Sequence, residues 1–258
     1  IVAEQVARLG FGSITLVDPD RVEKKNLNRI LNSTRHDAQN HRLKVEMFAE
    51  AIAAYRGPGV AHAISTAVDG REAIEAVARC DVIFCCVDSQ EGRQFADLIA
   101  SAFLIPLFDV GVVIPTFEND GMTAIADVCG RIDYVQPGGS SLSDRGVYTP
   151  EGLRAEYVRR VNPKAYEEEL EAGYIKGAME EAPSVITLNM RASSAVVSEF
   201  IARAYIFRQE ANRLYARTLF SLAACEEDHH AEDAFQARDN GLFGRGAEEP
   251  LLGLPALR

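Results

Sequence analysis

Residues 16–29 have the sequence Leu-Val-Asp-Pro-Asp-Arg-Val-Glu-Lys-Lys-Asn-Leu-Asn-Arg. The apolar residues that lead into this segment, from Ser13 onward, predict a short buried strand that ends at Asp18. An acidic residue at the carboxyl end of such a strand can bind the two hydroxyl groups of a ribose. An aspartate in this place is equally typical of a turn or a helix cap, so Asp18 by itself does not decide between these roles.

Strands and helices alternate on both sides of this segment. The clearest helical pattern spans residues 43–55, where apolar residues recur at steps of three and four. The continuous apolar run at 81–88 favours a strand that helices cover on both faces. The alternation predicts an α/β fold with a Rossmann-like, doubly wound and mostly parallel sheet. Further helices are predicted at 1–9, 71–79 and 92–103, and further strands at 60–68 and 105–112.

The second half of the chain departs from this alternation. Residues 123–135 predict an antiparallel extension of the sheet that turns at Gly130. A polar segment, the crossover excursion, follows at 137–183, and its acidic run is expected to be solvated. A long helix from Ser184 to Arg203 then returns to the core, and the residues from Cys225 onward predict an extended tail.

Composition excludes several classes of protein. The chain has 258 residues, 47% of them hydrophobic, which is enough for one large domain with a real core. Its net charge of −11 argues against a broad nucleic-acid surface. The most apolar helical stretch, 185–205, carries charged residues throughout, so no membrane span is expected. With no signal peptide and five irregularly spaced cysteines, the sequence favours a reducing, cytoplasmic location.

Four segments together resemble the ThiF/MoeB and ubiquitin-activating family. The first is strand-Asp-x-Asp-x-Val-Glu-x-x-Asn-Leu-Asn-Arg, from Asp18 to Arg29, and the second is Lys44 at the start of the next helix. The third is the strand that ends at Asp88, with an arginine five residues later and Ser89 where the family has asparagine. The fourth is the re-entry segment at 181–189.

The resemblance implies an enzyme that uses ATP and Mg²⁺ to adenylate the C-terminal carboxylate of a ubiquitin-like protein. Such a reaction gathers negative charge on the α- and β-phosphates, which fixed cations stabilise. Magnesium usually takes one or two carboxylates and keeps several waters. All the implied residues should converge on one cleft at the carboxyl ends of the parallel strands. By the family pattern, the ATP-binding residues are Asp18, Asn26, Arg29 and Lys44, the catalytic residues are Arg29, Lys44 and Asp88, and the magnesium ligand is Asp88.

Some of these assignments carry alternatives. Because the loop before Lys44 is slightly longer than usual in the family, Arg42 is the other candidate for the phosphate-binding cation. Arg93 is expected to be structural and to tie down the loop after the strand that ends at Asp88. The glycine-rich phosphate loop of the family is expected upstream of Ile1, so the sequence is expected to be a fragment.

The resemblance also implies a division of the chain. Residues 1–136 would form the nucleotide-binding core and 137–183 the crossover excursion. Residues 184–224 would contain the re-entry helix and the last part of the adenylation domain, and 225–258 the extended tail.

The cysteines depart from the family pattern. The sequence has no Cys-x-x-Cys pair, so the structural zinc of many family members is not expected. Cys85 and Cys86 lie in an apolar run and are interpreted as buried thiols. The crossover excursion contains no cysteine that could form a thioester. Serine cannot replace one, because an alkoxide is a far poorer leaving group than a thiolate; the serines at its start are Ser140, Ser141 and Ser143.

Two further cysteines are candidate nucleophiles. Cys129 lies in a strand-like context and is expected to be buried. Cys225 is the candidate thiol acceptor, although the acidic residues after it disfavour a thiolate. A metal site made of Cys225, His229 and His230 is the alternative interpretation of that cluster.

The expected partners follow from the family. The substrate would be a ubiquitin-like protein, and a conjugating enzyme or a sulfur carrier could accept the activated product. A homodimer is expected because the helix 184–203 is apolar on nearly every side and needs a second buried contact. Two other functions remain open: a non-catalytic scaffold subunit of an activating complex, and an NAD-dependent oxidoreductase, which would need neither magnesium nor Arg29.

Overall fold

The computed structural model describes residues 1–119, 122–172 and 185–254. Strands and helices alternate through the first 113 residues, and antiparallel strands follow them. The strands are β1 (Ile14–Val17), β2 (Ala61–Ile64), β3 (Ile83–Cys85), β4 (Leu107–Val113), β5 (Thr116–Asn119), β6 (Met122–Ile125), β7 (Cys129–Val135), β8 (Arg217–Ser221) and β9 (Glu226–His230).

The helices begin and end close to the predicted positions in the first half of the chain. The described residues also contain short 3₁₀ turns at Lys24–Asn26, Asn212–Leu214 and Glu232–Ala234. The α-helices are α1 (Val2–Arg8), α2 (Arg35–Gln39), α3 (Lys44–Arg56), α4 (Arg71–Val77), α5 (Gln90–Phe103), α6 (Pro150–Val161), α7 (Pro163–Glu171) and α8 (Ile186–Tyr205).

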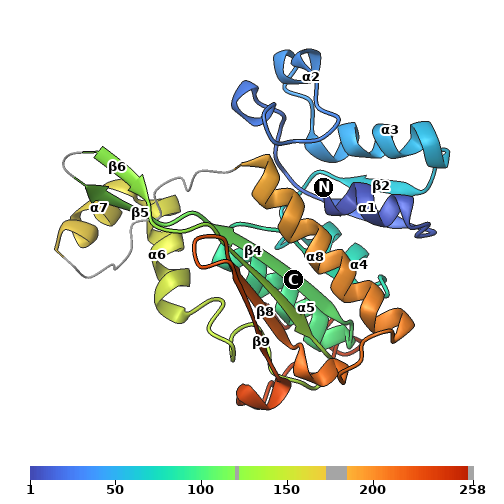
Figure 1. The fold of residues 1–258 in the computed structure, drawn as a ribbon. Coiled ribbons are helices and arrows are strands. Elements are labelled where there is room, and N and C mark those ends of the chain that lie inside the picture. Colours follow the sequence, from blue (N-terminus) through green and yellow to red (C-terminus); the bar gives the residue numbers. More distant parts are fainter. Residues whose placement is uncertain (120–121, 173–184, 255–258) are drawn as a thin grey trace.

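The strands form three groups in the described part of the chain. β1 pairs with β2 in parallel, and β3 pairs with β4 in parallel. The second sheet continues in the order β3-β4-β7-β8-β9, with every later pair antiparallel. β5 and β6 form a separate two-stranded ribbon, which projects from the body of the molecule (Figure 1). The expected Rossmann-like α/β fold with an antiparallel extension is therefore confirmed.

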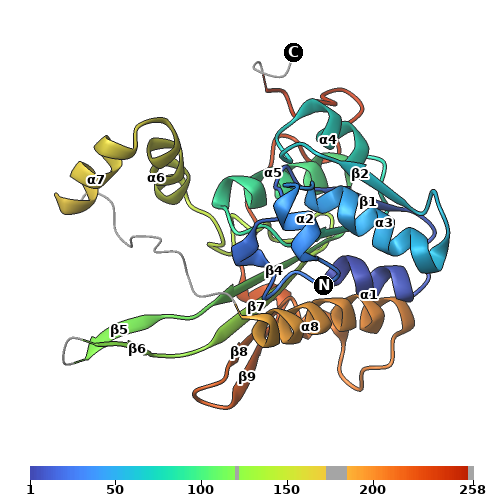
Figure 2. The ribbon, with the colours of Figure 1, turned by 90° about the horizontal axis from the view of Figure 1, so that it is seen from above.

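Helices cover both faces of the strand layer. α1 and α8 lie against one face, and α4 and α5 lie against the other (Figure 2). Each face has its own core cluster. One contains Phe108 of β4 and Val196 of α8, and the other contains Leu107 of β4 and Ile99 of α5. Adjacent residues of one strand thus face opposite layers, and this is why the strands are nearly continuous apolar runs.

The predicted turn at Gly130 is wrong. Gly130 lies inside β7, where it pairs with Val112 on one side and Phe220 on the other. A Cβ atom at this position would lie 2.1 Å from the ring of Phe220, which is buried. The glycine therefore makes room for an aromatic ring on the neighbouring strand, which the local sequence does not reveal.

The interpretation of the re-entry helix as apolar on nearly every side, and so in need of a second buried contact, is also wrong. α8 buries Leu188, Val196 and Val197 against the sheet and α1. The first residues of the predicted segment, 181–184, lie outside the described residues. The exposed positions of α8 recur at helical spacing and are mostly polar, so the helix is amphipathic and the chain itself covers its apolar face. These exposed residues are Thr187, Met190, Arg191, Ser194, Ser198, Ala204 and Tyr205.

The last part of the chain runs back over the body after β9. The backbone N–H of Gly244 donates to the carbonyl of Ser101 at 3.1 Å, and that of Gly246 to the carbonyl of Ala102 at 2.8 Å. These carbonyls belong to the last turn of α5, where helical partners are lacking. Leu252 is buried in the core cluster next to α5. No helix in the described part of the chain has the length and apolar character needed to cross a membrane.

Candidate functional site

Asp18 follows the last residue of β1, at the carboxyl end of that strand. One of its carboxylate oxygens accepts a hydrogen bond from the backbone N–H of Asp20 at 2.8 Å. The other oxygen lies 3.9 Å from Nζ of Lys44. Asp18 thus shapes the turn after the strand and still presents one oxygen toward a neighbouring cation, so the turn role and a binding role are compatible.

Lys44 is the first residue of α3, and its ammonium group lies 2.6 Å from the carboxylate of Asp20. Its backbone N–H also donates to the carbonyl of Asp20 at 2.9 Å. These two contacts hold the start of α3 beside the end of β1. The alternative cation, Arg42, pairs instead with Asp37 and Glu50. Of the two candidates, Lys44 is therefore the one beside Asp18.

Asp88 is exposed and lies three residues beyond the end of β3. It is close enough to Asp18 for its charge to act on that carboxylate. Burial raises the pKa of Asp18, the N–H of Asp20 and the charge of Lys44 lower it, and the charges of Asp20 and Asp88 raise it further. Lys44 thus lies beside Asp18, and Asp88 follows β3 within reach of the same carboxylate's electrostatic field.

Asn26 and Arg29 have more local contacts. Asn26 is buried, and its amide oxygen accepts from the backbone N–H of Glu23 at 3.1 Å, which closes a turn of 3₁₀ helix. The guanidinium of Arg29 donates to the carbonyl of Lys25 at 3.0 Å and to the side-chain oxygen of Asn28 at 3.3 Å. Among the described residues, no carboxylate forms an ion pair with it.

The chemistry of these groups suits a magnesium nucleotide. Carboxylate oxygens are preferred magnesium ligands, and an ammonium group can bind phosphate. The described residues contain no cluster of three or more His, Cys, Asp or Glu side chains placed to hold a metal ion. A magnesium ion at Asp88 would therefore take its remaining ligands from water and phosphate, which is its usual behaviour in nucleotide sites.

The structure separates Cys225 from this site. Cys225 is exposed in the turn between β8 and β9, with φ of 55°. That turn lies about three to four strands from β3, which is roughly 14–19 Å across a sheet with strands about 4.8 Å apart. His229 and His230 are consecutive residues of β9, so their side chains point to opposite faces and do not form a metal site with Cys225.

Two other predictions about cysteines need revision. Cys85 is buried as expected, but Cys86 is exposed, because it follows the end of β3. Cys129 is half-buried rather than buried, at the first position of β7.

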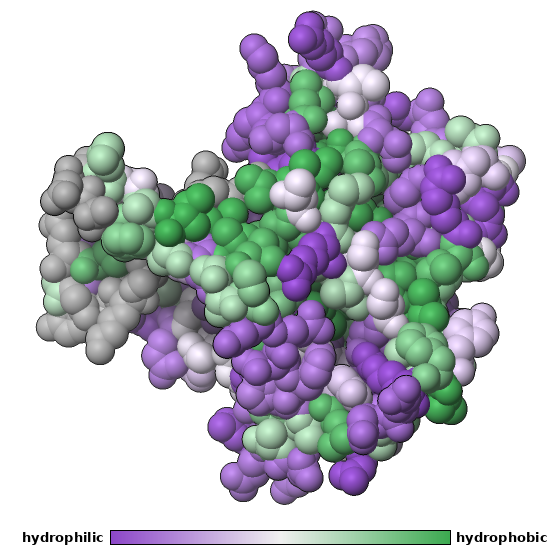
Figure 3. Space-filling model, in the orientation of Figure 1, coloured by the Kyte–Doolittle hydropathy of each residue, from purple (hydrophilic) through white to green (hydrophobic). Residues whose placement is uncertain are grey.

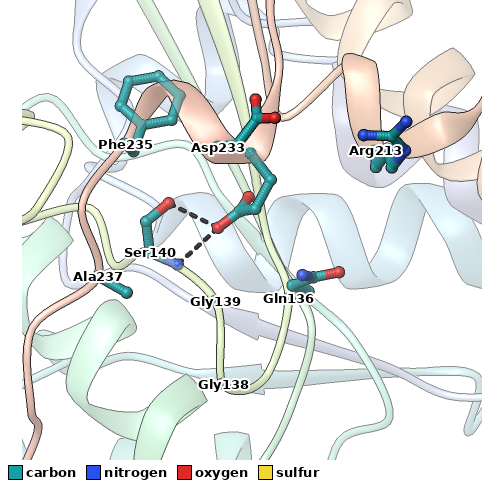
Figure 4. Close-up of a pocket in the computed structure, with 9 residues that line it drawn as sticks. Gln136, Gly138, Gly139, Ser140, Arg213, Asp233, Phe235 and Ala237 are labelled. Carbon is teal, nitrogen blue, oxygen red and sulfur yellow. Dashed lines mark hydrogen bonds between the residues drawn. The ribbon is translucent and has the colours of Figure 1, made fainter.

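A cavity of about 390 Å³ lies next to the end of β7 in the second sheet (Figure 4). Its walls include Gln136 and Gly138, which follow the end of β7, and the exposed Arg213. Because Val135 pairs with Leu107 at the start of β4, this cavity lies at the amino ends of the parallel strands. The N–H and hydroxyl of Ser140 both donate to Glu232 at its edge. The cavity is therefore separate from the cluster around Asp18 and Asp88.

Sequence reasoning missed a buried group of charges in the second sheet. Arg131 of β7 donates to Asp109 of β4 at 2.7 Å and to Asp133 at 2.6 Å. Arg145, from the start of the crossover excursion, also pairs with Asp133 at 3.2 Å. Arg93 lies 3.4 Å from Asp109, so it ties α5 to β4. Strand alternation could have indicated the inward positions of Asp109 and Asp133, but nothing local identifies their partners.

The fold and the site together define a Rossmann-like α/β protein with candidate nucleotide-binding residues at the carboxyl ends of its parallel strands. A family model described as the ThiF family matches residues 1–188. The chain belongs to the ThiF family. No curated protein matches it.

Several solved structures share the fold at low sequence identity. E. coli MccB with ATP is 13% identical with a TM-score of 0.64, and the match covers 94% of this chain and 62% of MccB. The microcin C7 biosynthetic enzyme MccB with N-formylated MccA is also 13% identical, with a TM-score of 0.66 and coverage of 93% and 63%. PaaA is 19% identical with a TM-score of 0.54 and coverage of 89% and 68%. The chain thus spans about three fifths of the length of MccB.

Proposed function

We propose that this protein adenylates the C-terminal carboxylate of a polypeptide with ATP and Mg²⁺. The observation that carries the proposal is the pairing of Lys44 with Asp18 at the carboxyl end of β1, with the charge of Asp88, beyond the end of β3, acting on the same carboxylate. Ligands bind at this edge in open α/β sheets. Membership of the ThiF family and the fold shared with MccB, which has been crystallised with ATP, support the same conclusion.

In the proposed reaction, a carboxylate oxygen of the substrate attacks the α-phosphorus of ATP. The bond to the β-phosphate breaks, pyrophosphate leaves with the bonding electron pair, and an acyl-adenylate remains. Catalysis rests on positioning and on charge stabilisation. Asp18 accepts hydrogen bonds from the ribose, with Asn26 holding the adjacent loop. Arg29 and Lys44 bind the phosphates.

Lys44 must exchange partners during this reaction. Its ammonium group pairs with Asp20 at 2.6 Å, and an incoming phosphate offers a stronger negative charge. Asp88 would hold the magnesium ion, which neutralises charge on the phosphates. Asp20 therefore keeps the ammonium group of Lys44 near the site before the nucleotide binds.

A ubiquitin-like protein is our preferred substrate, from the similarity of residues 18–29 and 88–93 to the activating enzymes. A conjugating enzyme or a sulfur carrier would receive the acyl group, because Cys225 lies well away from the site. MccB has been crystallised with MccA, so a substrate similar to MccA, in place of a ubiquitin-like protein, is the second candidate.

Exchange of labelled pyrophosphate into ATP tests the proposal. The wild-type protein should catalyse it only with its polypeptide substrate present. Asp88→Ala should abolish exchange and change the free energy of unfolding by less than about 0.5 kcal/mol, because the side chain is exposed.

Asp81→Ala is the matched control, since Asp81 is exposed at the opposite end of β3. It should retain full exchange. Equal exchange by the Asp88 variant and wild type would exclude the proposed role of Asp88. A wild-type protein that binds the polypeptide but never exchanges pyrophosphate would favour the scaffold function.

A further inference from the structure

The first turn of α5 is bound by a carboxylate from a distant part of the chain. The side chain of Glu156, in α6, accepts hydrogen bonds from the backbone N–H groups of Gln90 at 2.8 Å and Glu91 at 3.0 Å. These are the first two residues of α5, and their N–H groups have no acceptor within the helix. A carboxylate in this position also interacts favourably with the helix dipole. Asp88 lies only two residues before Gln90.

Two more polar contacts join α6 to the same turn. The side-chain oxygen of Gln90 accepts from the backbone N–H of Thr149 at 3.0 Å. The guanidinium of Arg160 binds both carboxylate oxygens of Glu91. α6 also approaches closely at Gly152, where a Cβ atom would lie 2.1 Å from the side-chain oxygen of Gln90. The fit of α6 on α5 is therefore specific.

Apolar packing contributes little to the position of α6. None of its residues is fully buried. Leu153 is its one residue that packs against the core cluster around α5. α6 and α7 stand apart from the three main layers, with α6 nearest to the first turn of α5 (Figure 2). Together with the buried Tyr148 just before α6, the polar contacts at the first turn of α5 thus determine where this helix lies.

We propose that Glu156 is a positioning residue that fixes the first turn of α5, and with it the segment of Asp88, to the crossover excursion. Ser89 connects the two, because its side chain caps α5 by accepting from the N–H of Gly92 at 3.1 Å. Glu156 immobilises the turn that follows Asp88, so the carboxylate of Asp88 has a defined direction. The inference rests on the proposed function to the extent that Asp88 holds magnesium.

Hydrogen exchange of individual amides tests the contact without reference to catalysis. Glu156→Gln removes the charge and one of the two acceptor oxygens. Charge-assisted hydrogen bonds contribute about 1.5–3 kcal/mol, so exchange at Gln90, Glu91 and α6 should accelerate about tenfold or more. Amides of β4 and β7 should be unchanged. Glu151→Gln removes the same charge from an exposed position of α6 and should leave Gln90 and Glu91 unaffected.

The magnesium requirement of pyrophosphate exchange separates positioning from a merely structural anchor. In Glu156→Gln the magnesium concentration for half-maximal rate should rise severalfold, while the rate at saturating magnesium stays within about twofold. A structural anchor would instead reduce the maximal rate through loss of folded protein.

If the amides of Gln90 and Glu91 exchange their hydrogens at the same rate in Glu156→Gln and in wild type, the inference is overturned. Faster hydrogen exchange at these amides in an active enzyme whose magnesium requirement is unchanged also overturns it, because Asp88 would then be independent of the Glu156 contact. A wild-type protein without pyrophosphate exchange refutes the proposed function, and the amide comparison alone then decides whether Glu156 holds the turn.

Discussion

The ammonium group of Lys44 lies between two carboxylates, 2.6 Å from Asp20 and 3.9 Å from Asp18, and its side chain is 19% exposed. We predict that Lys44→Ala lowers kcat/KM for ATP in pyrophosphate exchange by roughly 100-fold, the usual effect of removing one group that stabilises transition-state charge. Steady-state exchange rates at several ATP concentrations measure this.

Arg42→Ala provides the comparison for Lys44. Arg42 pairs with Asp37 and Glu50 rather than with the site, so this variant should keep wild-type exchange. Loss of activity in the Arg42 variant with retention in the Lys44 variant would reverse the assignment of the phosphate-binding cation.

Asp97 of α5 makes stability depend on pH. Its carboxylate accepts from the N–H of Leu142 at 3.1 Å and the hydroxyl of Tyr148 at 2.9 Å, and so joins α5 to the start of the crossover excursion. Burial raises the pKa of Asp97 to about 6, and the nearby charge of Asp144 adds to this, although the hydrogen bonds oppose it. The folded protein therefore binds the Asp97 proton more tightly than the unfolded chain, whose carboxyl has the usual pKa of about 4.

This difference has a definite sign. Between about pH 4 and pH 6 the folded state holds a proton that the unfolded state has lost, so this residue's contribution to stability falls as pH rises. We predict that the stability of wild type relative to Asp97→Asn decreases over this range and is constant above about pH 7. Urea unfolding at a series of pH values measures it; a relative stability that increases with pH would contradict it.

At the scale of elements, close packing between neighbouring strands decides how β7 pairs. Gly130 faces the ring of Phe220 on β8, and a Cβ atom would lie 2.1 Å from that ring. We predict that Gly130→Ala destabilises the fold by about 1–3 kcal/mol, the usual effect of overpacking a core. The midpoint of urea unfolding measures this.

A second substitution identifies the cause. Phe220→Leu should itself be destabilising, but Gly130→Ala added to it should be less harmful than in wild type, because the smaller side chain removes the clash. Strictly additive effects would mean that Gly130 is needed for another reason.

At the scale of the whole molecule, hydrophobic side chains gather where the β5–β6 ribbon leaves the body (Figure 3). Ile125 is 63% exposed, Phe117 is 50% and Val113 is 48%. Phe117 and Ile125 lie on opposite faces of the ribbon, because Phe117 pairs with Ala124 and Ile125 with Thr116. Exposed apolar side chains on both faces of an outlying ribbon are typical of an interaction site. Because α8 is already covered by its own chain, this surface replaces α8 as the best candidate for the predicted two-fold contact.

We predict that the wild-type protein is a dimer at high micromolar concentration and that Ile125→Ser is a monomer with nearly unchanged stability. Multi-angle light scattering gives both masses. Leu9→Ser is the control, since Leu9 is 50% exposed on another part of the molecule, and it should remain a dimer. A monomeric wild type would exclude the assembly, and a dimeric Ile125 variant would exclude the ribbon as its contact.

The amino-acid sequence by itself determined the alternating α/β fold, the position of β1 and the family, whereas β3 ends at Cys85 and not at Asp88 as predicted. These properties rest on local apolar patterns and on the spacing of Asp18, Arg29, Lys44 and Asp88. Short-range preferences and motifs express such information directly.

Only the tertiary structure decided which groups meet. The partner of Lys44 is 24 residues away, the carboxylate that caps α5 comes from 65 or 66 residues away, and the ring that requires Gly130 lies on β8. A residue's own neighbours in sequence carry no record of such contacts. They arise when separate elements pack together, because burial then leaves each backbone N–H, each charge and each ring to find a partner on whichever element lies beside it.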